Sequence, residues 1–147
     1  MSKSIKISTF ILRVALGWFF FYAGITKILN PEWTSLGFLE GAKTFSSLFS
    51  WFAQPDNIGW VNFLNEWGQL LIGTGLIFGA LTRLASFAAI LLMILYYLPG
   101  LEFPKVDHGF LIDDHIIYIF AFALMANLRA GIYWGVDRFW KKTAWWL

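Results

Sequence analysis

The sequence contains no cysteine. Disulfide bonds, iron–sulfur clusters, thiolate chemistry and a cysteine-linked lipid anchor are therefore all excluded from these 147 residues. Only two histidines are present, His108 and His115, so a haem held by two histidines of one chain is not expected. His108 falls in a predicted loop, and we assign it no role.

Charge is also scarce. Charged residues make up 14% of the chain, whereas a soluble domain of ordinary composition carries about a quarter. Apolar residues make up 59%, and they gather in runs long enough to cross a bilayer, which takes about 20 residues of helix. We therefore expect one integral membrane domain over residues 1–147, in contact with lipid. The net charge of +2 suggests no nucleic-acid partner, because the basic residues lie where membrane topology would place them.

Motifs for bound cofactors are missing as well. The sequence has no P-loop, no dinucleotide fingerprint, no His-x-x-His metal spacing and no nucleophile-elbow serine. No metal, haem or iron–sulfur cluster is expected. Redox chemistry on this chain would need a diffusible, membrane-soluble carrier such as a quinone.

Four apolar runs are present, and we interpret each as a transmembrane helix. They cover about residues 7–29, 60–80, 81–98 and 110–128, and Asn30-Pro31 and Pro99-Gly100 are typical helix stops. The second and third runs are joined so tightly that they must form an antiparallel hairpin. The simplest closure is an all-α four-helix bundle.

Basic residues set the expected orientation. Most lysines and arginines flank one side of the predicted bundle, among them Arg13, Arg83 and Arg129, to which we assign structural and topological roles. That side is predicted to be cytoplasmic. A multi-pass protein of the cytoplasmic (inner) membrane with both termini inside is therefore expected.

Two segments outside the spans have interfacial patterns. Within about 35–53, aromatic residues recur at helical spacing, which predicts one amphipathic helix on the outer membrane surface. The tryptophan-rich and basic segment of about 132–147 predicts an anchor on the inner surface.

The second run carries a polar stripe. Asn62, Asn65, Glu66 and Gln69 follow an i, i+3, i+4, i+7 spacing, so they share one helical face, which lipid cannot satisfy. The stripe is expected to face the bundle interior. Gly68, Gly75 and Gly79 offer small positions for close helix approach in the same run.

Further polar residues are expected at the same depth of the bundle. Lys27 lies near the end of the first run, and Asp113, Asp114, His115 and Tyr118 open the fourth. The hypothesis is one pocket at the outer ends of the helices. In it, Lys27, Asn62 and Tyr118 would bind substrate, while Glu66, Asp114 and His115 would handle protons.

Structural explanations remain open for the same residues. Lys27 would then extend to the headgroups or pair with Glu66, Asp113 and Asp114 would cap the helix, and His115 would be a satisfied bundle histidine.

The ordered motifs resemble the DoxX/DoxD family of membrane proteins. They are Leu12-Arg13-Val14-Ala15-Leu16-Gly17, Ala23-Gly24-Ile25-Thr26-Lys27, Glu66-Trp67-Gly68, the pair Gly75 and Gly79 with Thr82-Arg83, then Asp114-His115 with Tyr118, and Gly135-Val136-Asp137. The resemblance covers most of the chain. It implies similarity to the large subunit of a thiosulfate:quinone oxidoreductase, which joins two thiosulfates into tetrathionate and passes the electrons to quinone. It also implies a separate small DoxA-like subunit as a partner.

The sequence is compatible with three functions. The first is a membrane oxidoreductase, or its membrane subunit, that transfers electrons from a small outer-face donor to quinone. The alternatives are a non-catalytic scaffold of a redox complex and a small transporter, although a transporter predicts a continuous polar path that the inner half of the second run lacks. The glycine-rich faces are also compatible with a homodimer.

Overall fold

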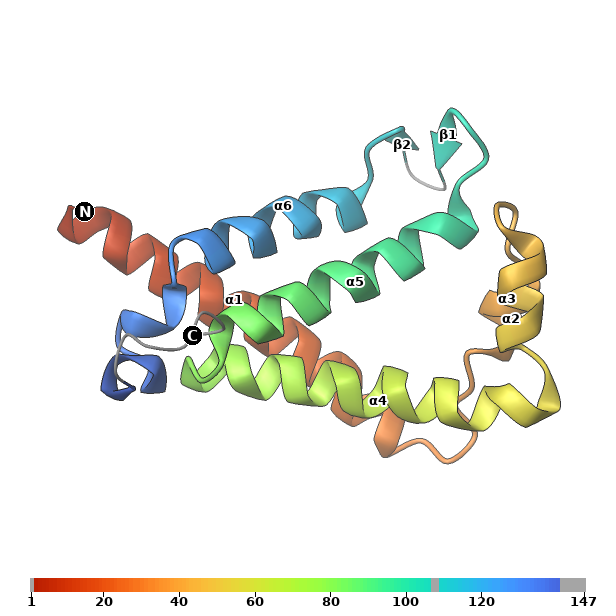
Figure 1. Ribbon diagram of the computed structural model, residues 1–147, viewed down its shortest axis with the longest axis horizontal. Coiled ribbons are helices and arrows are strands. Elements are labelled where there is room, and N and C mark those ends of the chain that lie inside the picture. Colours follow the sequence, from red (N-terminus) through yellow and green to blue (C-terminus); the bar gives the residue numbers. More distant parts are fainter. Residues whose placement is uncertain (1, 107–108, 141–147) are drawn as a thin grey trace.

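A computed structural model describes residues 2–106 and 109–140. Four long helices dominate it: α1 (Lys3–Ile28), α4 (Pro55–Phe78), α5 (Thr82–Gly100) and α6 (Asp114–Asn127). Figure 1 shows α1 lying along α4, and α5 between α4 and α6; these three pairs of neighbours pack against one another. The protein is thus mainly helical, as expected.

Two of these helices satisfy the requirements for crossing a membrane. Within the described residues, α1 and α5 are long and apolar enough by length and composition, whereas α6 has only 14 residues. Large apolar side chains such as Trp18, Leu71 and Leu91 are exposed, which suits contact with lipid. A membrane protein is therefore indicated, while four crossings in one bundle remain a prediction.

The helices α6 and α4 begin at positions other than those predicted, α6 later and α4 earlier. The fourth run was expected from about residue 110, but α6 begins only at Asp114, and two short strands, β1 (Lys105–Val106) and β2 (Gly109–Phe110), pair antiparallel before it. Asp113 then caps α6 by accepting a hydrogen bond from the amide of Ile116 at 3.2 Å. The second run was expected from about residue 60, but α4 begins five residues earlier, with Pro55 in its first turn.

The connection between α1 and α4, residues 29–54, is called the outer connection after its expected side. It contains two short helices and not the single amphipathic helix expected over about 35–53. These are α2 (Leu36–Glu40) and α3 (Ser46–Phe52), separated by bends. Phe45 precedes α3 in the left-handed region (φ 53°), so a continuous helix is interrupted there. The aromatic pattern nevertheless places Phe49 in the interior, where it is 1% exposed.

Close approach of α1 and α4 depends on three glycines. A Cβ on Gly73 would lie 2.2 Å from the amide nitrogen of Phe21, one on Gly24 2.5 Å from that of Leu70, and one on Gly17 2.8 Å from that of Ile77. A Cβ on Gly68 would meet no atom within 4 Å, so the prediction that Gly68 allows close helix approach is wrong. Gly75 does contribute, but against Ala80 and Ala85 at the α4–α5 turn.

The α4–α5 turn lies at the same end of the helices as the two short 3-10 segments, η1 (Ala130–Ile132) and η2 (Val136–Phe139) (Figure 1). Residues 132–140 of the expected inner anchor lie here, and its remainder, 141–147, lies outside the described residues. The core between the two ends is apolar. It includes Phe20, Leu76, Phe122 and Met125, each no more than 1% exposed.

Candidate functional site

Lys27 lies at the centre of a polar network at the end of the helices that is nearer to α2 and α3. Its Nζ donates to Asn65 Oδ1 and Gln69 Oε1, both at 2.7 Å, and to the Tyr96 hydroxyl at 3.1 Å. The Tyr96 hydroxyl in turn donates to Asn65 Oδ1 at 2.9 Å. The three elements α1, α4 and α5 are thereby joined around one ammonium group.

The partners of this ammonium are neutral. Among the described residues, no carboxylate lies within ion-pair distance of Lys27, and Glu66 acts on it only through a longer-range electrostatic attraction. All three N–H bonds of Lys27 are used by amide and hydroxyl oxygens. The positive charge is therefore held in place by dipoles without being neutralised by a contact pair.

A cavity of about 250 Å³ opens beside this network. Its walls include Lys27 from α1, Trp33 and Phe38 from the outer connection, Tyr96 from α5 and His115 from α6. Lys27 Nζ lies 4.7 Å from the centroid of the Trp33 ring, a cation–π contact. We name this space the Lys27 cavity; it combines a cation with aromatic faces.

His115 enters the cavity wall from the start of α6. Its Nδ1 lies 2.7 Å from Oδ2 of Asp113, a carboxylate that is almost fully buried. When Nδ1 carries the proton and donates a hydrogen bond to Asp113, Nε2 remains as the nitrogen that can accept a proton. The His115 ring also packs edge to face against Tyr96, with centroids 6.0 Å apart.

The structure thus brings together Lys27 and His115, two of the residues singled out from sequence. The other four do not line the Lys27 cavity. Asn62 binds the outer connection, because its Oδ1 accepts from the amide and hydroxyl of Ser35 at 3.0 and 2.7 Å. Tyr118 packs on Phe19 with ring centroids 5.3 Å apart.

The two remaining carboxylates lie at the margin. Asp114 is largely exposed, and its Oδ1 is 3.4 Å from His115 Nδ1. Glu66 is half-buried, and its carboxylate forms no hydrogen bond or ion pair among the residues that the structure describes. Charge attraction toward Lys27 is what connects Glu66 to the site.

Sequence reasoning missed four contributors. Tyr96 was overlooked because a tyrosine in an apolar run is typical of an interfacial belt, and Trp33 because tryptophan is common at such interfaces. Asn65 and Gln69 were recognised as part of the stripe but were given no role. The 4% exposure of Gln69 confirms that this part of the stripe faces inward.

Asp113, Asp114 and His115 are also the described residues whose ligand atoms could meet at one metal ion, since these atoms lie within 4.8 Å of one another. Both oxygens of Asp113 are already engaged, one with His115 and one with the Ile116 amide. A metal would have to displace the contact between Asp113 and His115.

Arg13 lies at the opposite end and is completely buried. Its Nη1 donates to the carbonyls of Ala130 at 2.9 Å and Tyr133 at 3.0 Å, and Asp137 attracts it electrostatically. Gly79, with φ of 66°, leaves room for the guanidinium: a Cβ there would lie 2.4 Å from Nη1. These contacts join α1 to the segment after α6, and the structural and topological role of Arg13 stays a prediction.

Asp137 completes this end. Its carboxylate accepts from the amides of Leu81 and Thr82 at 2.7 and 3.0 Å, so it caps α5 from a distant part of the chain. Arg83 lies in the first turn of α5, and Arg129 is exposed ahead of η1 in the left-handed region (φ 47°). Neither arginine reaches the Lys27 cavity.

Comparison with known proteins gives one match. A family model described as DoxX matches residues 8–98, which is well over half of the chain and includes Lys27, the stripe on α4 and Tyr96. His115 and Asp113 lie beyond the matched range. No curated protein and no solved structure matches the chain.

Proposed function

Because the chain belongs to the DoxX family and is a membrane protein, we propose that it is a membrane oxidoreductase, or the membrane subunit of one, that reduces quinone at the Lys27 cavity. The observation that carries this proposal is the ammonium of Lys27, held by neutral partners in the wall of an aromatic cavity. A preorganised charge of this kind stabilises negative charge that develops on a bound oxygen.

The residues present fit a quinone. A quinone head is a flat ring with carbonyl oxygens, and the cavity offers the Trp33 and Tyr96 rings beside the Lys27 charge. When bound, the quinone supplies the chemistry of a two-electron, two-proton acceptor. The chain's own contribution is to orient the head, exclude water with aromatic walls and hold a proton at His115.

Proton handling is assigned to His115 and Asp113. The carboxylate keeps Nδ1 protonated and orients the ring, so that Nε2 is the site that gains and releases a proton. Asp114 and Glu66 remain candidates as peripheral carboxylates. Asn62 and Tyr118 act indirectly, by holding the outer connection and the α1–α6 contact in place.

Thiosulfate is the proposed electron donor. Two thiosulfate dianions form one sulfur–sulfur bond and release two electrons, and the quinone takes up these electrons with two protons, giving tetrathionate and quinol. The charge of Lys27, which has no carboxylate in direct contact among the described residues, supports this choice, because it attracts anions to this end of the helices. A small DoxA-like subunit and a second copy of the chain are the proposed partners.

The proposed location is the cytoplasmic membrane, with the start of α1 and the α4–α5 turn on the cytoplasmic side. The Lys27 cavity would then face outward. The core beneath Gln69, which includes Ile72, Leu76 and Met93, is apolar and offers no polar path across the helices in the described residues. This supports a site open to one side and disfavours a transporter.

The test is thiosulfate-dependent reduction of a short-chain quinone by the purified protein in lipid nanodiscs. Lys27→Met is expected to lower kcat/KM by roughly 10²-fold, because the fixed positive charge in the cavity wall near the reacting oxygen is lost. Lys43→Met is the matched control: it removes a lysine at the same end of the molecule that is paired with Glu102 at 3.4 Å, outside the cavity.

Equal losses in the two variants would contradict a site at Lys27. No turnover by folded protein supplied with its co-purified partners would exclude thiosulfate as donor. Failure to bind any quinone under these conditions would overturn the oxidoreductase and favour the scaffold.

A further inference from the structure

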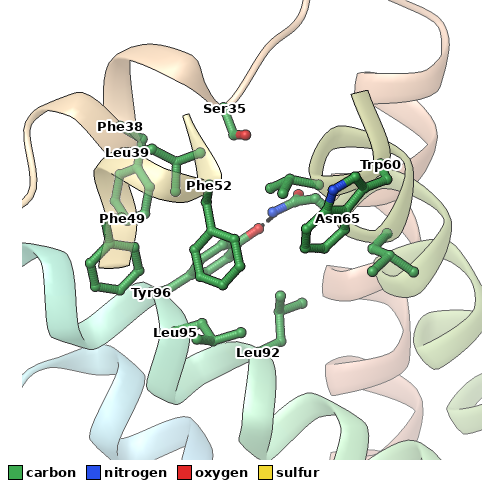
Figure 2. A pocket seen from close by; sticks show the side chains of 12 residues that line it. Ser35, Phe38, Leu39, Phe49, Phe52, Trp60, Asn65, Leu92, Leu95 and Tyr96 are labelled. Atoms are coloured by element: carbon green, nitrogen blue, oxygen red, sulfur yellow. Dashed lines mark hydrogen bonds between the residues drawn. The ribbon is translucent and has the colours of Figure 1, made fainter. Parts of the chain in front are cut away.

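A second cavity of about 130 Å³ lies next to the first. Figure 2 shows its walls: Phe49 and Phe52 come from the outer connection, Trp60 from α4, and Leu92 and Leu95 from α5. We name this space the apolar chamber. Its lining contrasts with the Lys27 cavity because no charged side chain contributes to it.

The two cavities are adjacent. Ser35, Phe38, Asn65 and Tyr96 belong to the walls of both. Phe38 and Tyr96 also pack edge to face, with ring centroids 5.8 Å apart. A ligand with one polar and one apolar end that passes these shared residues would occupy both spaces at once.

The apolar chamber does not suit a polar occupant. The Ser35 hydroxyl is bound to Asn62 at 2.7 Å, and the Tyr96 hydroxyl and Asn65 Oδ1 are bound to each other and to Lys27. A polar group entering here would lose its hydrogen bonds to water without replacement. Hydrocarbon loses nothing and gains contact with the aromatic walls.

We propose that the apolar chamber binds the hydrocarbon tail of the quinone whose head occupies the Lys27 cavity, so that the site selects long-tailed membrane quinones. This inference rests on the proposed function. The division of the ligand follows from the two linings: the larger, charged space takes the ring, and the smaller, apolar space takes the slender chain.

Asn62 has a positioning role in this arrangement. By accepting from both the amide and the hydroxyl of Ser35, it holds the outer connection against α4. That connection supplies Phe38, Phe49 and Phe52, which close the chamber on one side (Figure 2).

The test compares two quinones with the same ring, one bearing a decyl chain and one bearing only a methyl group. Binding is measured in nanodiscs as quinone retained in excess of empty nanodiscs, and each variant is compared with the unchanged protein for the same ligand. Leu95→Trp fills the chamber and is expected to weaken decyl-quinone binding at least tenfold while leaving the methyl-quinone within twofold. Leu91→Trp is the matched control, because Leu91 is 60% exposed on the same helix and lines neither cavity.

Two further variants separate the possible failures. Leu95→Ala, which enlarges the chamber without adding bulk, is expected to weaken only the decyl-quinone, by several-fold, and serves if the tryptophan variant does not fold. Lys27→Met is expected to weaken both quinones. If the Leu95 variants affect both ligands equally or neither, the tail chamber is overturned while quinone binding at Lys27 stands.

If the unchanged protein binds neither quinone, the proposed function and the tail chamber fall together. A last arm uses decanoate, which has a tail and an anionic head but no quinone ring. Decanoate binding as tight as that of decyl-quinone, and equally sensitive to Leu95→Trp, would assign the chamber to an acyl chain and overturn the quinone as its occupant.

Discussion

At the scale of single residues, the network is defined by what its side chains already bind. Lys27 directs every N–H toward a neutral oxygen, and Asp113 uses one oxygen for the helix cap and the other for His115. Such fixed partners hold the charge of Lys27 and the ring of His115 in one geometry before any ligand arrives. Reorganisation during a reaction is thereby reduced.

The Asp113–His115 contact leads to a prediction at this scale. Asp113→Asn retains a side chain able to cap α6 but removes the negative charge that orients the imidazole. Quinone reduction is expected to fall by roughly 10²-fold, within the range for a disabled general acid–base group, with helix content by circular dichroism unchanged. The measurement is kcat against pH for both proteins.

Asp114→Asn is the control for this prediction, because Asp114 is exposed and farther from the imidazole. As a peripheral carboxylate, Asp114 is expected to contribute less, so that its replacement lowers kcat by less than tenfold. Equal loss in both variants would show that overall charge at the start of α6, and not the orientation of His115, governs the rate.

At the scale of elements, the contact between α1 and α4 determines where the network can form. Gly17, Gly24 and Gly73 let the two backbones approach closely, and Lys27 then reaches Asn65 and Gln69 across the interface. A widened interface would move the ammonium away from its amide partners. Packing of this kind is the main source of helix association in lipid.

Two glycines of α4 test this point. Gly73→Ala places a methyl group against the Phe21 backbone and is expected to destabilise the protein by about 1–3 kcal/mol, as overpacking does. Gly68→Ala meets nothing within 4 Å and should be neutral or stabilise by up to about 1 kcal/mol through helix propensity. Thermal unfolding in detergent, followed by circular dichroism, distinguishes them; similar melting temperatures for both variants would contradict the close contact.

Much at this scale could be predicted from the sequence. The four apolar runs gave the long helices, because periodic hydrophobicity is a local signal. The break of the outer segment at Phe45 and the paired strands before α6 could not be predicted, since a left-handed residue and a two-residue strand depend on tertiary contacts.

Part of the candidate site was also predictable, because the spacing of polar residues within a helix is a local signal. The polar stripe on α4 and the depth of Lys27 indicated a site near the helix ends, and Lys27 and His115 do share a cavity. Tyr96 was not identifiable, because its role exists only through three hydrogen-bonding partners on two other helices, and its own neighbours in sequence are apolar or aromatic. The alternative in which Lys27 pairs with Glu66 could not be judged from the sequence either, because it depends on which side-chain oxygens lie nearest to Lys27 Nζ. These oxygens belong to Asn65, Gln69 and Tyr96.

At the scale of the whole molecule, the two ends of the helices differ in chemistry. One end holds the Lys27 cavity and the aromatic outer connection, and the other holds buried Arg13 with Asp137. Figure 1 shows the start of α1 at the end opposite to α2 and α3. In the proposed orientation, the end with the Lys27 cavity lies on the outer side of the membrane, and the end with Arg13 lies on the cytoplasmic side.

The absence of cysteine allows a direct test of that orientation. Ser4→Cys, near the start of α1, is expected to resist a membrane-impermeant maleimide added to intact cells. Asp56→Cys, exposed in the first turn of α4, is expected to react. Both should react after the membrane is permeabilised. The reverse pattern would invert the topology, and labelling of both in intact cells would exclude an arrangement with these positions on opposite sides.

Arg13 also has a consequence for the order in which the protein is made. Its two carbonyl partners are 117 and 120 residues farther along the chain, so during synthesis α1 is complete long before they exist. Until then the guanidinium must remain near water or headgroups, since an isolated charge is not stable in hydrocarbon. With helices inserted one after another, as the proposed topology requires, α1 reaches its final depth only when residues 130–137 have left the ribosome, so its placement depends on a segment made at least 117 residues later.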